Sequence, residues 1–154
     1  MRLSQCCARN TQVSGFTVVE LLAVVTIAGA LTALGVPKIQ QTVEKARVAQ
    51  AIGEIHALSV NLATQDTLPD ELSFVGPLPT DPWGNPYQYN KFPPGKKVPK
   101  GARKDRFLVP INTEYDLYSV GRDGVTTAPL TAKASQDDVI RANDGGFIGL
   151  ASNY

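Results

Sequence analysis

The stretch SGFTVVELLAVVTIAGALTALGVPK, residues 14–38, decides how the rest of this chain is organised. The 21 residues from Phe16 to Val36 are apolar or nearly so, and about 20 such residues cross the hydrocarbon core of a bilayer as a helix. One carboxylate, Glu20, lies inside this segment. An acidic side chain within a membrane span costs roughly 2.5–3.5 kcal/mol on insertion scales, so such residues are usually functional. We therefore expect Glu20 to have a partner outside the segment.

The residues before the apolar segment form a short polar leader that carries Arg2 and Arg9. A secretory signal peptide has its small-residue cleavage site after the apolar region, whereas Gly15 comes before it. A lipoprotein signal also needs the apolar region first, but the two cysteines, Cys6 and Cys7, both precede it. The order of these parts is therefore wrong for both kinds of signal.

Length and charge limit what the remainder can be. The chain has 154 residues, enough for one modest domain, and its net charge of +1 does not favour a strongly basic nucleic-acid binder. Its only two cysteines are adjacent, so no disulfide framework is expected. The arginines of the leader favour a cytoplasmic N-terminus, with the rest of the chain on the other side of the membrane.

The segment GFTVVELLAVVTIAGALTALGVP, residues 15–37, resembles the N-terminus of the type IV pilin and type II secretion pseudopilin superfamily. The resemblance implies that a dedicated prepilin peptidase cleaves between Gly15 and Phe16 and methylates the new N-terminal residue, Phe16. It matches Glu20 to the family's glutamate, and Gly29 and Pro37 to its helix-loosening glycine and proline. The parts implied are a leader (1–15), a membrane or filament-core helix (16–37) and a periplasmic globular domain (38–154).

The resemblance also supplies a partner for Glu20. Cleavage leaves a free amine on Phe16, which is a second unpaired charge in lipid. If the amine of one protomer meets the Glu20 carboxylate of its neighbour, both desolvation costs are offset. The charge pair would then fix the stagger between subunits of a filament.

The implied fold is α+β and pilin-like, with one long N-terminal helix packed on a small antiparallel sheet and a loop-rich C-terminal region. Beyond Pro37 the pattern becomes amphipathic, with apolar residues at steps of three and four. Because helices of the family run through this proline with a bend, we expect one helix from about Thr17 to about Thr64. The side that it buries is predicted to contain Val48, Ala51, Ile52, Ile55, Leu58 and Leu62.

The segment LPTDPWGNPYQYN, residues 78–90, predicts a tight turn followed by a strand. Its only tryptophan, Trp83, is either a core residue beneath the turn or a stacking platform for a sugar or base, and the core is favoured. The motif DPWGNPYQY is similar to the segment that opens the sheet in the major pseudopilins (G subunits) of type II secretion. This resemblance favours pseudopilins over adhesive pilins.

Residues 91–106 form a basic loop with seven basic residues and one acid, whereas residues 107–154 hold six acids and three bases. Nucleic-acid binding would fit such a loop, but apart from Phe92 it lacks interleaved aromatic residues, so a solvated loop is favoured. The two charge-rich regions could also attract each other between neighbours in a filament.

Clustered aspartates near the C-terminus suggest two alternatives. Asp138 precedes Val139-Ile140 and could begin a helix, or the aspartates could bind calcium, which takes six to eight oxygen ligands. The segment DLYSVGRDG, residues 116–124, is similar to the calcium loop of the G subunits. That resemblance implies a structural calcium ion held by Asp123 and one or both of Asp137 and Asp138, with carbonyls near residues 117–120.

Three functions are compatible with these features of the sequence. The first is a structural subunit of a type II secretion pseudopilus, polymerised in the inner membrane as a homo-oligomer with minor pseudopilins and an assembly platform. The second is a type IV pilin of a surface fibre for adhesion, motility or DNA uptake. The third is a signal-anchored periplasmic enzyme, but the sequence contains no nucleophile–base pair, metal-ligand cluster or phosphate loop. We expect the first, with no catalytic residues and no nucleic-acid partner.

Overall fold

The computed structural model describes residues 15–72, 80–95 and 98–154, leaving out the side chains of residues 34, 35 and 37. The predicted leader, apart from Gly15, lies outside the described residues. The chain divides into two compact units, Met1–Gln41 and Thr42–Tyr154.

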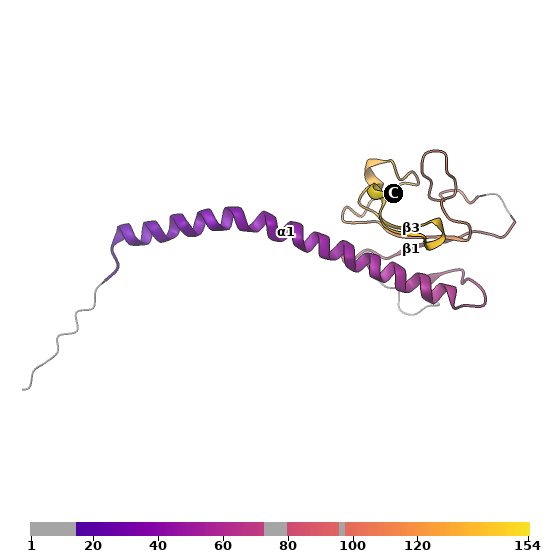
Figure 1. Cartoon of the computed structure of the whole chain (residues 1–154), viewed down its shortest axis with the longest axis horizontal. Coiled ribbons are helices and arrows are strands. Elements are labelled where there is room, and N and C mark those ends of the chain that lie inside the picture. Colours follow the sequence, from indigo (N-terminus) through magenta and orange to yellow (C-terminus); the bar gives the residue numbers. More distant parts are fainter. Residues whose placement is uncertain (1–14, 73–79, 96–97) are drawn as a thin grey trace, which may run out of the picture. The chain divides into compact units, whose positions relative to one another are not determined.

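One long helix, α1 (Val18–Ala63, 46 residues), confirms the predicted helix and differs from its expected bounds by one residue at each end (Figure 1). Thr17 stays outside because it caps the helix: its Oγ1 accepts the N–H of Glu20 at 3.2 Å, and its carbonyl accepts the N–H of Leu21 at 3.2 Å. The helix continues through Pro37. Whether Gly29 and Pro37 bend it stays a prediction.

The sheet has four short antiparallel strands in the order β1-β2-β3-β4. In its register Tyr89 lies opposite Leu117, and Ile140 lies opposite both Tyr118 and Gly149. Three short 3-10 turns connect and follow the later strands. The elements are β1 (Gln88–Lys91), β2 (Tyr115–Ser119), η2 (Lys133–Ser135), β3 (Val139–Ala142), η3 (Asn143–Gly145), β4 (Phe147–Leu150) and η4 (Ala151–Asn153).

The last turns of α1 pack on one face of this sheet (Figure 1). The predicted amphipathic pattern is confirmed, because four of its residues are buried and the other two, Val48 and Ile52, pack at the edge. Apolar side chains from β2 and β3 meet them, which joins helix and sheet into one core. This core contains Ala51, Ile55, Leu58, Leu62, Leu72, Tyr87, Tyr115, Leu117 and Val139.

The opposite face of the sheet is also buried, beneath loops. Ile140 and Ala142 of β3 pack there with Ile111, Leu130 and Ala151. This second core explains why side chains on both faces of β2 are buried, including the carboxylate of Asp116, which is 1 % exposed. The loops of the C-terminal region therefore form a layer of the fold.

The predicted turn before β1 is present, and Asp81 organises it. Its carboxylate Oδ1 accepts the backbone N–H groups of Trp83 at 3.1 Å and Asn85 at 2.7 Å, while Gly84 adopts a φ of +94°. Only glycine takes that conformation without strain. Trp83 packs against the core, and its Nε1 donates to Glu44 of α1 at 3.1 Å, which confirms the core interpretation.

The prediction that Asp138 begins a helix is wrong. The residues after it form strand β3, which pairs with both β2 and β4. Val139 and Ile140 are β-branched and fully buried, one on each face of the sheet, so tertiary packing favours the strand.

Candidate assembly segment and acidic loop

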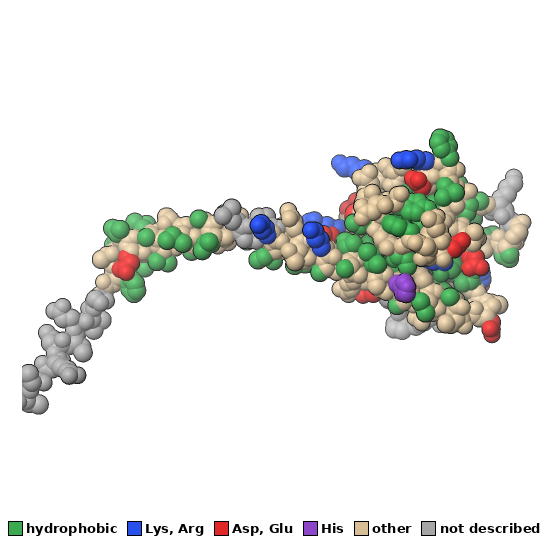
Figure 2. All heavy atoms as spheres, in the orientation of Figure 1, with side chains coloured by type: hydrophobic (Ala, Val, Ile, Leu, Met, Phe, Trp, Pro, Cys, Tyr) green, Lys and Arg blue, Asp and Glu red, His purple; other side chains and the backbone are tan. Residues whose placement is uncertain are grey.

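The described side chains in the first part of α1 are all exposed, and Figure 2 shows apolar side chains along one face of it. Phe16, Val18 and Val19 are 75 %, 74 % and 76 % exposed. Of the described helices, α1 is the one long and apolar enough to cross a membrane. An apolar surface of this extent marks a membrane or protein contact.

The predicted processing and assembly residues lie together at the start of this segment. The peptide bond between Gly15 and Phe16 is in a non-helical stretch ahead of α1, and both residues are exposed. Glu20 is exposed in the first helical turn, and no partner of its carboxylate lies among the described residues. Thr17 and Glu20 have the spacing of a helix-capping box, with Thr17 as the cap. The sequence reasoning did not identify this capping role.

Gly29 lies within the exposed part of α1, where a Cβ atom would meet nothing within 4 Å. Packing inside this unit therefore does not require a glycine there. A role for this small residue against a partner, or in loosening the helix, stays a prediction.

The three aspartates of the predicted calcium site differ in environment. Asp123 is exposed, and its Oδ1 accepts the N–H of Val125 at 2.8 Å. Asp137 Oδ2 accepts the N–H of Asp123 at 3.1 Å, so these two residues lie close together. A Cβ on Gly121, which has a φ of +68°, would lie 2.4 Å from the Asp137 carbonyl oxygen, so only glycine fits there. Asp138 instead is fully buried.

Asp138 forms an ion pair with Arg103 of the basic loop and also accepts the hydroxyl of Thr126 at 2.6 Å. Burial raises the pKa of the Asp138 carboxyl, while the Thr126 hydrogen bond and the charge of Arg103 act against that rise. We expected the basic and acidic regions to attract each other between neighbouring subunits. The Arg103–Asp138 pair instead forms within one chain. Sequence reasoning missed Arg103, because nothing distinguishes it from the other basic residues of the loop.

The residues present do not fit a calcium ion held by all three aspartates. A calcium ion takes six to eight oxygen ligands. Among the described residues, no group of three His, Cys, Asp or Glu side chains is placed to hold a metal, and Asp138 faces a guanidinium. Asp123 and Asp137 remain as candidate ligands with nearby carbonyls, and calcium stays a prediction.

A second buried carboxylate, that of Asp116, also binds the basic loop. Asp116 of β2 accepts the backbone N–H of Arg103 at 2.7 Å and the side-chain amide of Asn112 at 2.9 Å. Burial raises the pKa of the Asp116 carboxyl, and these hydrogen bonds oppose that rise. Asp116 therefore anchors the basic loop to the sheet.

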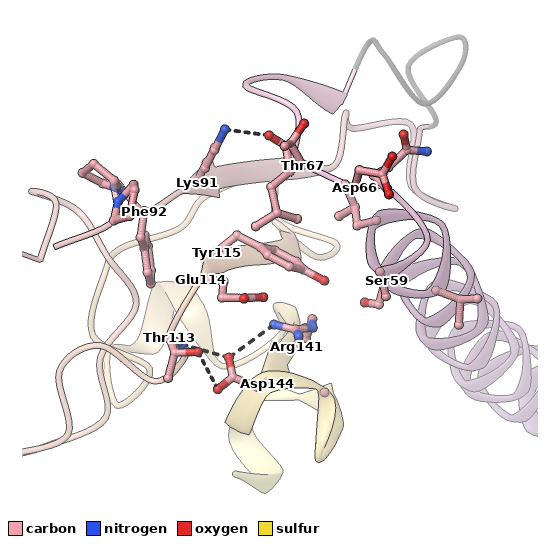
Figure 3. Close-up of a pocket in the computed structure, with 18 of the residues that line it drawn as sticks. Ser59, Asp66, Thr67, Lys91, Phe92, Thr113, Glu114, Tyr115, Arg141 and Asp144 are labelled. Atoms are coloured by element: carbon pink, nitrogen blue, oxygen red, sulfur yellow. Dashed lines mark hydrogen bonds and ion pairs between the residues drawn. The ribbon is translucent and has the colours of Figure 1, made fainter. Parts of the chain in front are cut away.

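A cavity of about 900 Å³ lies in the second unit beside the end of α1 (Figure 3). Arg141 lies between Tyr115 and Asp144 at this cavity, with its Cζ 4.2 Å from the Tyr115 ring centroid. His56 and Ser59 both line it, but the Ser59 hydroxyl has no hydrogen-bond partner among the described residues. This geometry provides no nucleophile–base pair at Ser59.

Comparison with known proteins gives a consistent result. The chain is similar to the type II secretion system core protein G of Pseudomonas aeruginosa, with 34 % identity over 142 aligned positions that cover 75 % of this chain and 88 % of the relative. The proteins of the same name from Aeromonas hydrophila and Vibrio cholerae are each 33 % identical, covering 72 % of this chain and 84 % and 82 % of the relatives. No family model matches the chain, and no solved structure matches it significantly.

Proposed function

The chain belongs to the type II secretion system core protein G family, and from this premise we propose that it is a structural subunit of a pseudopilus. The observation that carries the proposal is the 34 % identity over most of both chains. The layout of a long helix on a small antiparallel sheet agrees with it. These relatives are named as secretion components, and nothing in the comparison favours a surface pilin.

The exposed apolar half of α1 has two proposed environments. Before assembly it lies in the inner membrane as a single-pass anchor, with the leader in the cytoplasm and the globular domain in the periplasm. After assembly it packs against the same segment of neighbouring subunits in the filament core. Both environments cover the apolar surface that the isolated chain exposes.

Processing at Gly15 is compatible with the local structure. The helix α1 begins only after Thr17, so cleavage by a prepilin peptidase between Gly15 and Phe16 would leave all of α1 in the mature chain. The new amine of Phe16, which we propose is methylated, would lie beside the positive end of the helix dipole. Glu20 in the first turn offsets this positive charge. In the filament we propose that Glu20 pairs with the Phe16 amine of a neighbour.

The partners proposed for this chain are copies of itself, the prepilin peptidase, the minor pseudopilins and an inner-membrane assembly platform. Deletion of its gene from the host tests the function. Type II secreted proteins should then accumulate in the periplasm while surface fibres persist, and the wild-type gene should restore secretion.

Loss of surface fibres with normal secretion would contradict the pseudopilus. A Gly15→Leu variant is the processing control. It should retain its leader, detectable by intact mass, and it should fail to restore secretion even though its globular unit is unchanged.

A further inference from the structure

One side chain of the basic loop, that of Arg103, is buried inside the second unit. Arg103 is 2 % exposed and is the largest of the fully buried side chains in the described chain. Burying a guanidinium is costly unless it is paired and hydrogen-bonded, so its surroundings indicate what it does there.

The guanidinium contacts three separate parts of the second unit. Its Nη1 donates to Thr126 Oγ1 at 2.7 Å and to the Thr127 carbonyl, while Nη2 donates to Asp138 Oδ2. Its Cζ lies 3.9 Å from the ring centroid of Tyr118 on β2. One cation therefore joins the middle and the end of the acidic loop (residues 121–138) to the sheet.

The backbone around Arg103 fixes the loop in the same place. The N–H of Lys104 donates to the Ala128 carbonyl at 3.0 Å, and the N–H of Leu130 donates to the Lys104 carbonyl at 2.9 Å. Because the Arg103 N–H is held by Asp116, the guanidinium is presented to Asp138 from a loop that is already anchored. Such preorganisation lowers the entropy cost of the ion pair.

Two buried atoms in this cluster, Nε of Arg103 and Oδ1 of Asp138, have no hydrogen-bond partner among the residues that the structure describes. One is a donor and the other an acceptor, and they belong to the two side chains that already share a hydrogen bond. A side-on, bidentate arginine–carboxylate pair would satisfy both atoms. In that arrangement the guanidinium alone would supply the positive charge that the Asp138 carboxylate faces.

We propose that the Arg103 guanidinium is the cation that fastens the acidic loop in this chain, in the role that the family resemblance assigns to calcium. The positive charge comes from the basic loop, and folding of the second unit does not require a metal ion. Asp138 is the acceptor of this ion pair.

The full chain in detergent micelles provides the first test, with thermal unfolding followed by the fluorescence of its single tryptophan. Trp83 packs in the core of the second unit and therefore reports on that unit. The wild-type melting temperature should be the same in excess calcium and in excess chelator. A calcium-dependent rise that disappears in Asp123→Ala would overturn the proposal, because ligand binding to the folded state raises that temperature.

The Arg103→Gln variant should melt lower by on the order of 10 °C or more, because it leaves a buried carboxylate without a counter-charge. The matched control is Arg122→Gln, which removes an exposed arginine of the acidic loop and should leave the melting temperature within about 2 °C. Equal melting of the two variants would overturn the proposal.

A double variant keeps the test decisive if Arg103→Gln does not fold. Arg103→Gln combined with Asp138→Asn removes both charges and should melt higher than either single variant, because no buried charge is left unpaired. A double variant that melts no higher than either single variant would overturn the ion pair as the fastening.

Discussion

The first part of α1 and the sheet's loop-covered face reverse the usual distribution of side chains. Apolar residues such as Phe16 and Val19 are about three-quarters exposed, whereas Arg103, Asp116 and Asp138 are almost completely buried. None of the described residues of its own unit covers the apolar segment, and we propose that lipid or neighbouring copies cover it. The charged groups find their partners within one chain: Arg103 pairs with Asp138, and Asp116 accepts N–H groups of Arg103 and Asn112. We therefore expect assembly and folding to respond to different substitutions.

Glu20→Ala gives the largest expected effect and should break only the first region. Secretion should be lost, because the filament would then lack the charge that we propose pairs with the Phe16 amine of a neighbour. The thermal unfolding of the second unit, read from Trp83, should not change. Secreted protein in the medium and tryptophan fluorescence of the same variant measure both outcomes.

Lys45→Ala is the matched control for Glu20, since it removes an exposed charge from the same helix outside the apolar segment. It should retain secretion. Normal secretion by Glu20→Ala would show that this carboxylate is not an assembly residue.

Asp116→Ala should destabilise the globular unit and leave the apolar segment of α1 unchanged. The Arg103 backbone N–H would be buried without an acceptor, and the Asn112 amide would keep only its bond to the Arg141 carbonyl. We expect this to cost about 4 kcal/mol in the free energy of unfolding. Urea unfolding of the full chain in micelles measures this loss. Asp105 of the same loop is half-buried, and its backbone pairs with Leu108, outside β2. A cost of Asp116→Ala equal to that of Asp105→Ala would contradict the anchoring role.

Leu62→Ala tests the join between the end of α1 and the sheet. Leu62 is 1 % exposed in the first core, so the truncation should leave a cavity and cost about 3 kcal/mol in the free energy of unfolding. Val60, two residues earlier, is 50 % exposed, and Val60→Ala should cost less than about 0.5 kcal/mol. Urea unfolding compares the pair, and similar costs would mean that this face of α1 is not buried.

The smallest expected effect is that of Tyr89 ionisation on stability, which appears only at alkaline pH. Burial, with smaller contributions from Tyr115 and nearby carboxylates, raises the pKa of Tyr89 to about 12. A raised folded-state pKa means that stability is fully present below about pH 10, the ordinary value, and is lost as the pH rises toward 12. Trp83 fluorescence against pH should show this loss in wild type, and Tyr89→Phe should reduce it. An equal alkaline loss in both proteins would contradict the assignment to Tyr89.

Sequence reasoning predicted the parts of the fold that depend on local patterns. The spacing of apolar residues, together with the resemblance to a family whose helix runs through the proline, located α1 to within one residue at each end. Pro, Gly and Asp identified the turn before β1. It was wrong about Val139-Ile140, because a short β-branched pair fits a helix or a strand until neighbouring strands are present.

The sequence by itself determined the exposed apolar segment, its single carboxylate and the amphipathic face that follows, because helical periodicity is a local property. Only the tertiary structure decided that Arg103, among the described basic residues of the loop, enters the core, and which of three aspartates it meets. Arg103 and Asp138 are 35 residues apart, and their pairing depends on loops that pack on the far face of the sheet. A charge pattern in the sequence predicts that two regions attract each other. Which particular pair is buried depends on how the surrounding side chains pack.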